Sequence, residues 1–174
     1  MFLATNTELH LQEFFRCFTN DATLRLPLVR VYKNALARFV TGRLRIAGIT
    51  VGRRILLAPS QVEAHVESSN ECEKVREFVV SEELLVHEMM HVVQFERDGF
   101  VGFVRGYVGD YLRTLWREKR CDAATRMMAY LAIPAECEAR AAAAAYTQWR
   151  VTVDGNIEEN NVARRNSPIC LFEK

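Results

Sequence analysis

Hydrophobic residues recur at helical spacing in several parts of this chain. In residues 7–19, leucines and phenylalanines fall mainly on one face of a helix, which predicts a short amphipathic helix. Residues 82–95 lack glycine and proline and carry hydrophobic side chains on nearly every side, which is typical of a buried helix. Ser81 stands at its N-cap position, and Gly99 follows where helices commonly end. Further helices are expected in three downstream segments: residues 100–119, 122–131 and 135–149.

Two earlier stretches have the character of β-strands. Residues 24–32 alternate in part between hydrophobic and polar side chains, with Pro27 near the start of the strand or on a sheet edge. Residues 44–58 contain two runs rich in β-branched and aliphatic residues, and Gly52 between the runs predicts a hairpin. The mixed, polar residues 60–80 are expected to form a connecting loop or a helix.

Length and composition fit one folded domain. The chain has 174 residues, of which 49% are hydrophobic and 26% are charged, and its formal net charge is +1. We expect a single α+β domain over residues 1–150, in which a small, mostly antiparallel sheet from residues 24–58 packs on the 82–95 helix and further helices follow. The polar residues 151–174 are expected to form an extended tail.

Charge and cysteine patterns narrow the possible partners and location. No basic run with interleaved aromatic residues occurs, so no nucleic-acid partner is expected. The first residues lack the basic and apolar regions of a signal peptide, and no stretch approaches about 18 apolar residues, so we expect no membrane partner. Five scattered cysteines without a Cys-x-x-Cys pair suit a reducing compartment, and we therefore expect a cytoplasmic protein.

The glycines of the 100–119 segment predict close packing of helices. Gly102, Gly106 and Gly109 follow one another at spacings of four and three residues, as small residues do where two helices approach closely. A membrane helix is disfavoured because the segment carries several charged residues: Arg105, Asp110 and Arg113. The expected setting is a helix packed tightly in the core of the domain.

Residues 87–91 read His-Glu-Met-Met-His within the expected buried helix. Two histidines four positions apart project from one helix face towards a common point, as zinc ligands do. Glu88 lies beside them and can act as a general base on a water molecule. Two ordinary helix histidines would leave these polar groups buried without partners. The pattern therefore favours Zn²⁺ held by His87 and His91, with a third ligand from elsewhere.

The third ligand must be sought among few residues. No histidine follows the pentapeptide, and the other two, His10 and His65, lie upstream. Glu96 points roughly 140° away from the last histidine of the pentapeptide on the same helix, which makes it a poor candidate. Glu136 and Glu138 begin the 135–149 helix and are better placed. Because they lie about 200° apart around that helix, only one of them can face the metal.

The chain resembles the gluzincin zinc metallopeptidases, and most closely small bacterial domains with His-Glu-x-x-His-x-x-Gln and a later Glu-x-Glu-Ala helix. The likeness rests on three stretches: Ile49–Leu57, His87–Gln94 and Ile133–Ala139. It implies hydrolysis of a peptide or protein substrate with Zn²⁺ as cofactor. It also implies that His87, His91 and Glu136 are the metal ligands and that Glu88 is the catalytic base.

One position departs from that family pattern. Many gluzincins have an aspartate directly after the alanine of the later helix, where it hydrogen-bonds a ligand histidine. This chain has Arg140 there, four residues beyond Glu136 and able to pair with it. The group that orients the ligand histidine must then come from another part of the chain.

Several alternatives stay open at this point. The donor that stabilises the oxyanion of a peptidase is not chosen among four residues: His65, Tyr107, Tyr111 and Tyr130. Residues 55–58 would bind the substrate backbone by strand addition if they lie at a sheet edge. Two other functions compete with catalysis, namely a zinc-stapled binding domain of the same fold and a metal-free helical interaction protein.

Overall fold

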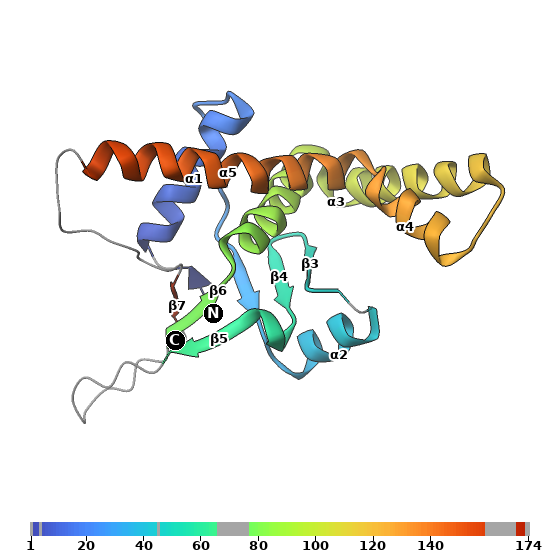
Figure 1. Ribbon diagram of the computed structural model, residues 1–174, viewed down its shortest axis with the longest axis horizontal. Helices are drawn as coiled ribbons and strands as arrows, with labels where there is room; N and C mark the ends of the chain where they lie inside the picture. Colours follow the sequence, from blue (N-terminus) through green and yellow to red (C-terminus); the bar gives the residue numbers. More distant parts are fainter. Residues whose placement is uncertain (1, 4, 45, 66–76, 159–169, 173–174) are drawn as a thin grey trace.

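The computed structural model describes all residues except 1, 4, 45, 66–76, 159–169 and 173–174, and within that part it contains a seven-stranded sheet and five α-helices (Figure 1). The helices are α1 Thr5–Thr19, α2 Ala35–Leu44, α3 Glu82–Glu118, α4 Ala123–Leu131 and α5 Pro134–Glu158. The strands are β1 Phe2–Leu3, β2 Arg30–Tyr32, β3 Gly48–Val51, β4 Arg54–Leu57, β5 Val62–His65, β6 Glu77–Val80 and β7 Cys170–Phe172.

The sheet confirms the expected α+β fold with mostly antiparallel pairing. Its strand order is β3-β4-β2-β1-β7-β6-β5, and only the β2–β4 pair is parallel. The sheet nevertheless extends well beyond residues 24–58. The expectation of a loop or helix over residues 60–80 is wrong where the structure describes this stretch, because β5 and β6 lie there. Both pair in a sheet that also holds β7 from the far end of the chain, and such long-range pairing leaves little local signal.

The tail also differs from the expectation. Helix α5 continues to Glu158, and Cys170–Phe172 pairs with β1 and β6, so these parts of residues 151–174 are not an extended tail. By contrast, the hairpin around Gly52 is present as β3 and β4 in antiparallel register. Strand β4 lies between β3 and β2, so the hypothesis of substrate binding along residues 55–58 fails, since that strand is not at an edge. The edge strands are β3 and β5.

Helix α3 is kinked at Gly99, the position where the sequence predicts that one helix ends and another follows. Gly99 has φ 69° and ψ 163°, which separates a first half from a second half that ends before the left-handed Lys119. In the first half, every side chain from Met89 to Phe95 is buried. The expectation of a buried helix over residues 82–95 is therefore confirmed for its central part. No helix in the described part of the chain is both long enough and apolar enough to cross a bilayer.

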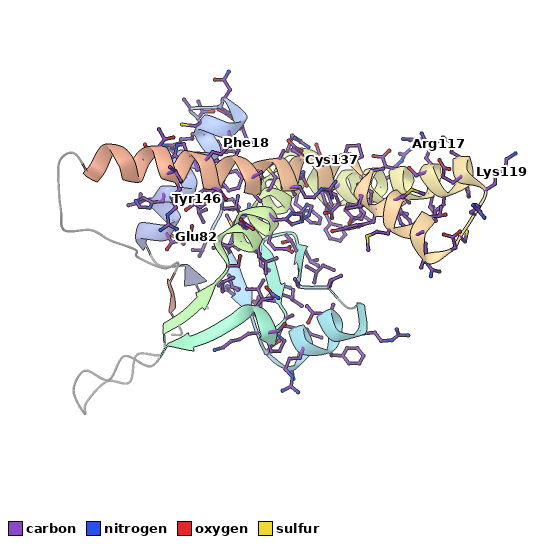
Figure 2. All side chains as sticks on the ribbon, viewed as in Figure 1. Phe18, Glu82, Arg117, Lys119, Cys137 and Tyr146 are labelled. Atoms are coloured by element: carbon purple, nitrogen blue, oxygen red, sulfur yellow. The ribbon has the colours of Figure 1, made fainter. Side chains whose placement is uncertain are left out.

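The core lies where α1, α3 and α5 meet on the sheet. Phe14 of α1 packs edge-on against Tyr146 of α5, with ring centroids 5.0 Å apart, and Figure 2 shows Tyr146 where these helices lie together. Ala139 and Ala142 of α5 are fully buried, and α5 has its most extensive contacts with α3. Small side chains on this face let α5 approach the first half of α3 closely, which places the start of α5 beside residues 87–91.

The glycines of the second half of α3 do not mediate close packing. A Cβ built on Gly106 or Gly109 meets no atom within 4 Å, and one built on Gly102 meets only Asp98 Cβ, at 3.7 Å. The prediction of tight helix packing at these positions is therefore wrong. The spacing of the glycines is typical of a helix face that packs against another helix, but here this face is turned away from the rest of the described protein.

The turn between β3 and β4 gives a test of local backbone preference. Gly52 has φ +59° and a Cβ there would meet nothing within 4 Å, so Gly52→Ala should cost about 1 kcal/mol of unfolding free energy through the backbone alone. Gly42 in α2 has the same open surroundings but lies in a helix, so Gly42→Ala should stabilise the protein by about 0.5–1 kcal/mol. Urea unfolding of both variants measures the difference, and equal effects would contradict a strained turn.

Candidate metal centre

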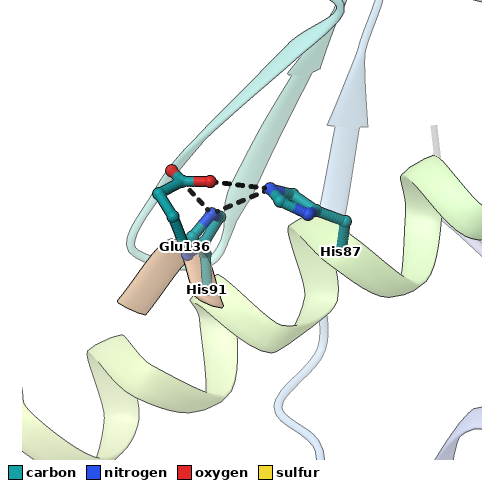
Figure 3. A group of neighbouring side chains, drawn as sticks. All are labelled: His87, His91 and Glu136. Atoms are coloured by element: carbon teal, nitrogen blue, oxygen red, sulfur yellow. Dashed lines mark hydrogen bonds and ion pairs between the residues drawn. The ribbon is translucent and has the colours of Figure 1, made fainter. Parts of the chain in front are cut away.

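Three side chains converge beside the first half of α3 (Figure 3). His87 and His91 project from one face of α3, and Glu136 reaches them from the first turn of α5. The two Nε2 atoms of the histidines lie 3.2 Å apart. Glu136 Oε2 lies 3.3 Å from His87 Nε2, and Glu136 Oε1 lies 3.4 Å from His91 Nε2. The three groups together could hold a metal ion.

The spacing of the donor atoms fits a small tetrahedral cation. Ligand atoms about 2.0–2.1 Å from a tetrahedral zinc ion are about 3.3–3.4 Å from one another. The two Nε2 atoms are 3.2 Å apart, and each lies 3.3 or 3.4 Å from a different oxygen of the Glu136 carboxylate. With one ligand atom taken from each residue, the three atoms lie within 4.8 Å of one another, so the group could hold a metal ion. The site is almost closed to solvent, since the side chains of His91 and Glu136 are 8% and 4% exposed.

Gln94 determines which nitrogen of His91 faces this centre. The Gln94 amide nitrogen donates to the carbonyl oxygen of Ala135 at 3.0 Å and to Glu138 Oε2 at 2.8 Å. Both partners, a backbone carbonyl and a carboxylate, are hydrogen-bond acceptors, so they fix the amide NH2 group on this side. The Gln94 carbonyl oxygen therefore points to His91 Nδ1, 2.8 Å away, and accepts its hydrogen. In the neutral ring this leaves the Nε2 lone pair directed at the other two ligands.

Glu138 and Arg140 have other partners than the metal group. Glu138 accepts hydrogen bonds from Gln94 and from Arg97, whose Nη1 lies 3.0 Å from Glu138 Oε1. Arg140 donates to the carbonyl oxygen of Leu131 rather than to Glu136. Of the two glutamates left open by the sequence, the structure brings Glu136 to the histidines and turns Glu138 to the opposite side of Gln94. A hydrogen bond to a histidine, which the family pattern gives to an aspartate, is made here by Gln94.

Two tyrosines hold the carboxylate of Glu136. Tyr107 donates to Oε1 at 2.7 Å, and Tyr130 of α4 donates to Oε2 at 2.8 Å. Burial alone would raise the pKa of Glu136, but its contacts with His87 and His91 and the hydrogen bond from Tyr107 outweigh burial and hold the pKa well below its usual range. Burial and the hydrogen bond to Glu136 raise the pKa of both tyrosines, so they remain hydroxyl donors.

Strand β3 shapes the surroundings of Glu88. The hydroxyl of Thr50 donates to Glu88 Oε2 at 2.7 Å, and the Glu88 side chain is buried. A Cβ at position 48 would lie 2.7 Å from Glu88 Oε1, so Gly48 leaves the space that the carboxylate occupies. Burial raises the pKa of Glu88, although the Thr50 hydrogen bond and the nearby charges of His91 and His87 oppose that rise.

Sequence reasoning missed the contribution of several of these residues. The roles of Gly48 and Thr50 depend on β3 lying across α3, which no local pattern reveals. Gln94 stands three residues after His91, a spacing at which helix side chains meet, and this was the available signal. The other expected candidates lie apart: Tyr111 has no described contact with the three ligands, Glu96 forms an ion pair with Arg53, and the side chain of His65 lies outside the described residues.

The role of Gln94 can be tested by a single substitution that keeps the shape of the side chain. Gln94→Met keeps a similar shape but loses the hydrogen bonds, so the affinity for an added divalent metal ion should fall about 10- to 100-fold, as expected when a group that orients a ligand is removed. Competition with a chromophoric chelator measures the affinity. Gln148→Met, at an exposed position of α5, is the matched control and should leave the affinity unchanged. Equal affinities for the two variants would show that Gln94 does not orient His91.

The site therefore consists of three potential ligands, one residue that orients a ligand, two tyrosines on the carboxylate ligand and a separate buried glutamate. The likeness to gluzincins rests on the sequence of Ile49–Leu57, His87–Gln94 and Ile133–Ala139 alone. Comparison of the chain with protein-family models, curated proteins and solved structures finds no match.

Proposed function

We propose that this protein is a zinc-dependent peptidase in which Glu88 is the general base. The observation that carries the proposal is the meeting of His87 and His91 of α3 with the carboxylate of Glu136 of α5, at contact distances of 3.2–3.4 Å, while Glu88 is buried on the same helix as the histidines. Two imidazoles and one carboxylate form a donor set that suits zinc, and sites with three protein ligands are those that retain an open position for catalysis.

The chemistry that zinc supplies when bound is Lewis acidity, which lowers the pKa of water to about 7 and polarises a carbonyl group. The protein supplies proton transfer. Glu88 accepts a proton from the attacking water and returns it to the leaving amine of the cleaved peptide. A raised pKa suits both steps, because the group must gain and lose the proton near neutral pH. Thr50 keeps one carboxylate oxygen of Glu88 in place.

The substrate is proposed to bind along β3. This strand is at the sheet edge, and its residue Thr50 touches Glu88 directly. An extended peptide that adds to β3 would form backbone hydrogen bonds with it and pass the metal group. The proposal assigns no oxyanion donor, because the hydroxyls of Tyr107 and Tyr130 are both directed at Glu136.

A second function, a zinc-stapled domain without catalysis, is favoured by one observation. The carboxylate of Glu136 is held from two sides by tyrosines, and His91, Glu88 and Glu136 are all buried. Such a closed cluster would join α3 to α5 and stabilise the fold when metal binds. His87, with 18% of its side chain exposed, is the most accessible of the three ligands.

The test is a search for cleavage by the zinc-loaded protein. A mixture of unstructured peptides is incubated with the zinc form and with protein treated with chelator, and products are read by mass spectrometry. Peptidase function predicts new termini only with the zinc form, and their return when zinc is added back to the treated protein. A protein that binds one zinc per chain and cleaves no peptide would instead be the stapled domain.

A further inference from the structure

The second half of α3 presents an apolar surface to solvent. Five hydrophobic residues recur every three or four positions and therefore lie along one side of the helix: Val101, Val104, Val108, Leu112 and Trp116. All five are exposed, and the values for Val101 and Trp116 reach 76% and 77%. We call this set the α3 stripe. It extends for about 22 Å along the helix, since its ends are fifteen residues apart.

The α3 stripe has no partner within the described protein. Figure 1 shows the second half of α3 and α4 reaching beyond the sheet, away from the core formed by α1 and α5. The half-buried face of this helix half, which includes Phe103 and Tyr107, is the one turned to the rest of the protein. The open space around Gly106 and Gly109, beside the stripe, confirms that this side of the helix meets nothing in the described chain.

Positive charge surrounds the α3 stripe. Residues 97–126 contain seven basic and four acidic residues, a net charge of +3, whereas the whole chain has a net charge of +1. The acidic side chains Asp98, Asp110 and Glu118 already form ion pairs with arginines of this segment. Among the described basic residues of this segment, Arg105, Lys119 and Arg126 have no such ion pair, and Figure 2 shows Lys119 at the far end of the helix.

We propose that the α3 stripe binds the surface of an anionic lipid bilayer. An amphipathic helix with a tryptophan on its apolar side and basic residues around it lies in the interface between headgroups and acyl chains. Arg105 falls within the stripe, where its long side chain can keep the charge among the headgroups while its stem contacts the apolar side chains. This proposal departs from the expectation of no membrane partner, which rested on the absence of a spanning segment and of a signal peptide. The exposure of the stripe is visible only in the fold.

The charge around the α3 stripe favours an anionic bilayer over a second copy of the chain as its partner. Two stripes facing each other would bring Arg105 of each copy into an apolar interface together with the surplus positive charge around it, which opposes pairing. An anionic surface attracts the same charges, and each basic residue near it contributes to binding. The proposal is independent of peptidase function, since neither Glu88 nor the three ligands take part.

Flotation of the full-length protein with vesicles tests the proposal. Binding to phosphatidylcholine vesicles containing phosphatidylglycerol should exceed binding to phosphatidylcholine alone by at least about tenfold, and added salt should reduce it. The variant V101Q/L112Q/W116Q should lower the partition coefficient about a hundredfold. R105Q/K119Q should lower it about 25-fold on anionic vesicles only, at about fivefold for each charge.

A matched control lies on α2. Leu36 and Phe39 are 61% and 70% exposed, so L36Q/F39Q removes comparable apolar surface elsewhere and should leave binding unchanged. Circular dichroism checks that each variant folds. Equal loss in the control, or no flotation with either vesicle, overturns the proposal. A concentration-dependent dimer in sedimentation velocity that V101Q/L112Q/W116Q abolishes, or stripe-dependent binding of a protein without any binding to vesicles, overturns it in favour of a protein partner.

Discussion

Glutamine in place of Glu136 is expected to weaken zinc binding roughly a thousandfold, which is about 4 kcal/mol. The substitution preserves the size of the side chain and one carbonyl oxygen for a tyrosine hydroxyl. It removes the negative charge and the carboxylate that lies 3.3 and 3.4 Å from the two imidazole nitrogens. The loss should exceed the 10- to 100-fold effect expected at Gln94, because Glu136 is proposed to touch the metal and Gln94 is not.

The neighbouring glutamate provides the control for this measurement. Glu138 lies two residues further along α5, but it accepts hydrogen bonds from Gln94 and Arg97. Glu138→Gln should therefore keep zinc affinity within about tenfold of the parent protein. Chelator competition on both variants decides between the two carboxylates. A large loss in Glu138→Gln with little change in Glu136→Gln would exchange their roles.

The first half of α3 and the shared face of its two histidines could be predicted because their signals are local. His87 and His91 share a helix face by their spacing alone, and the absence of glycine and proline before Gly99 sets the limits of the buried segment. The hairpin at Gly52 is equally local, since two strands joined by a short turn are neighbours in sequence. In these parts of the chain the local sequence pattern and the tertiary structure favour the same secondary structure.

The rest of the site depends on contacts between distant segments. Helix geometry leaves both Glu136 and Glu138 open, and only the resemblance favours Glu136. The packing of α5 on α3 directs Glu136 to the histidines and Glu138 to Gln94. Thr50 meets Glu88 across a separation of 38 residues. The prediction from the glycines of α3 was wrong because their spacing places them on one side of the helix but does not indicate whether another element packs against that side.

Glu88→Gln is expected to reduce peptide cleavage by about 100- to 10,000-fold while zinc affinity changes only a few-fold. Glutamine has the same shape and can still accept the hydrogen bond from Thr50, but its amide cannot take a proton from water near neutral pH. Separate measurement of zinc content and of cleavage rate isolates this chemical step from metal loss. Glu83→Gln, at an exposed position in the first turn of the same helix, is the control and should keep both properties.

The outcome of that experiment separates the base from the metal site. Cleavage that persists in Glu88→Gln with zinc still bound would remove Glu88 from the mechanism but would leave His87, His91 and Glu136 as ligands. Cleavage that disappears together with zinc would mean that the substitution disturbs the site, and Thr50→Val then becomes informative. That variant removes a hydroxyl that touches Glu88 but none of the ligands, so a slower rate at full zinc content still traces the defect to the carboxylate.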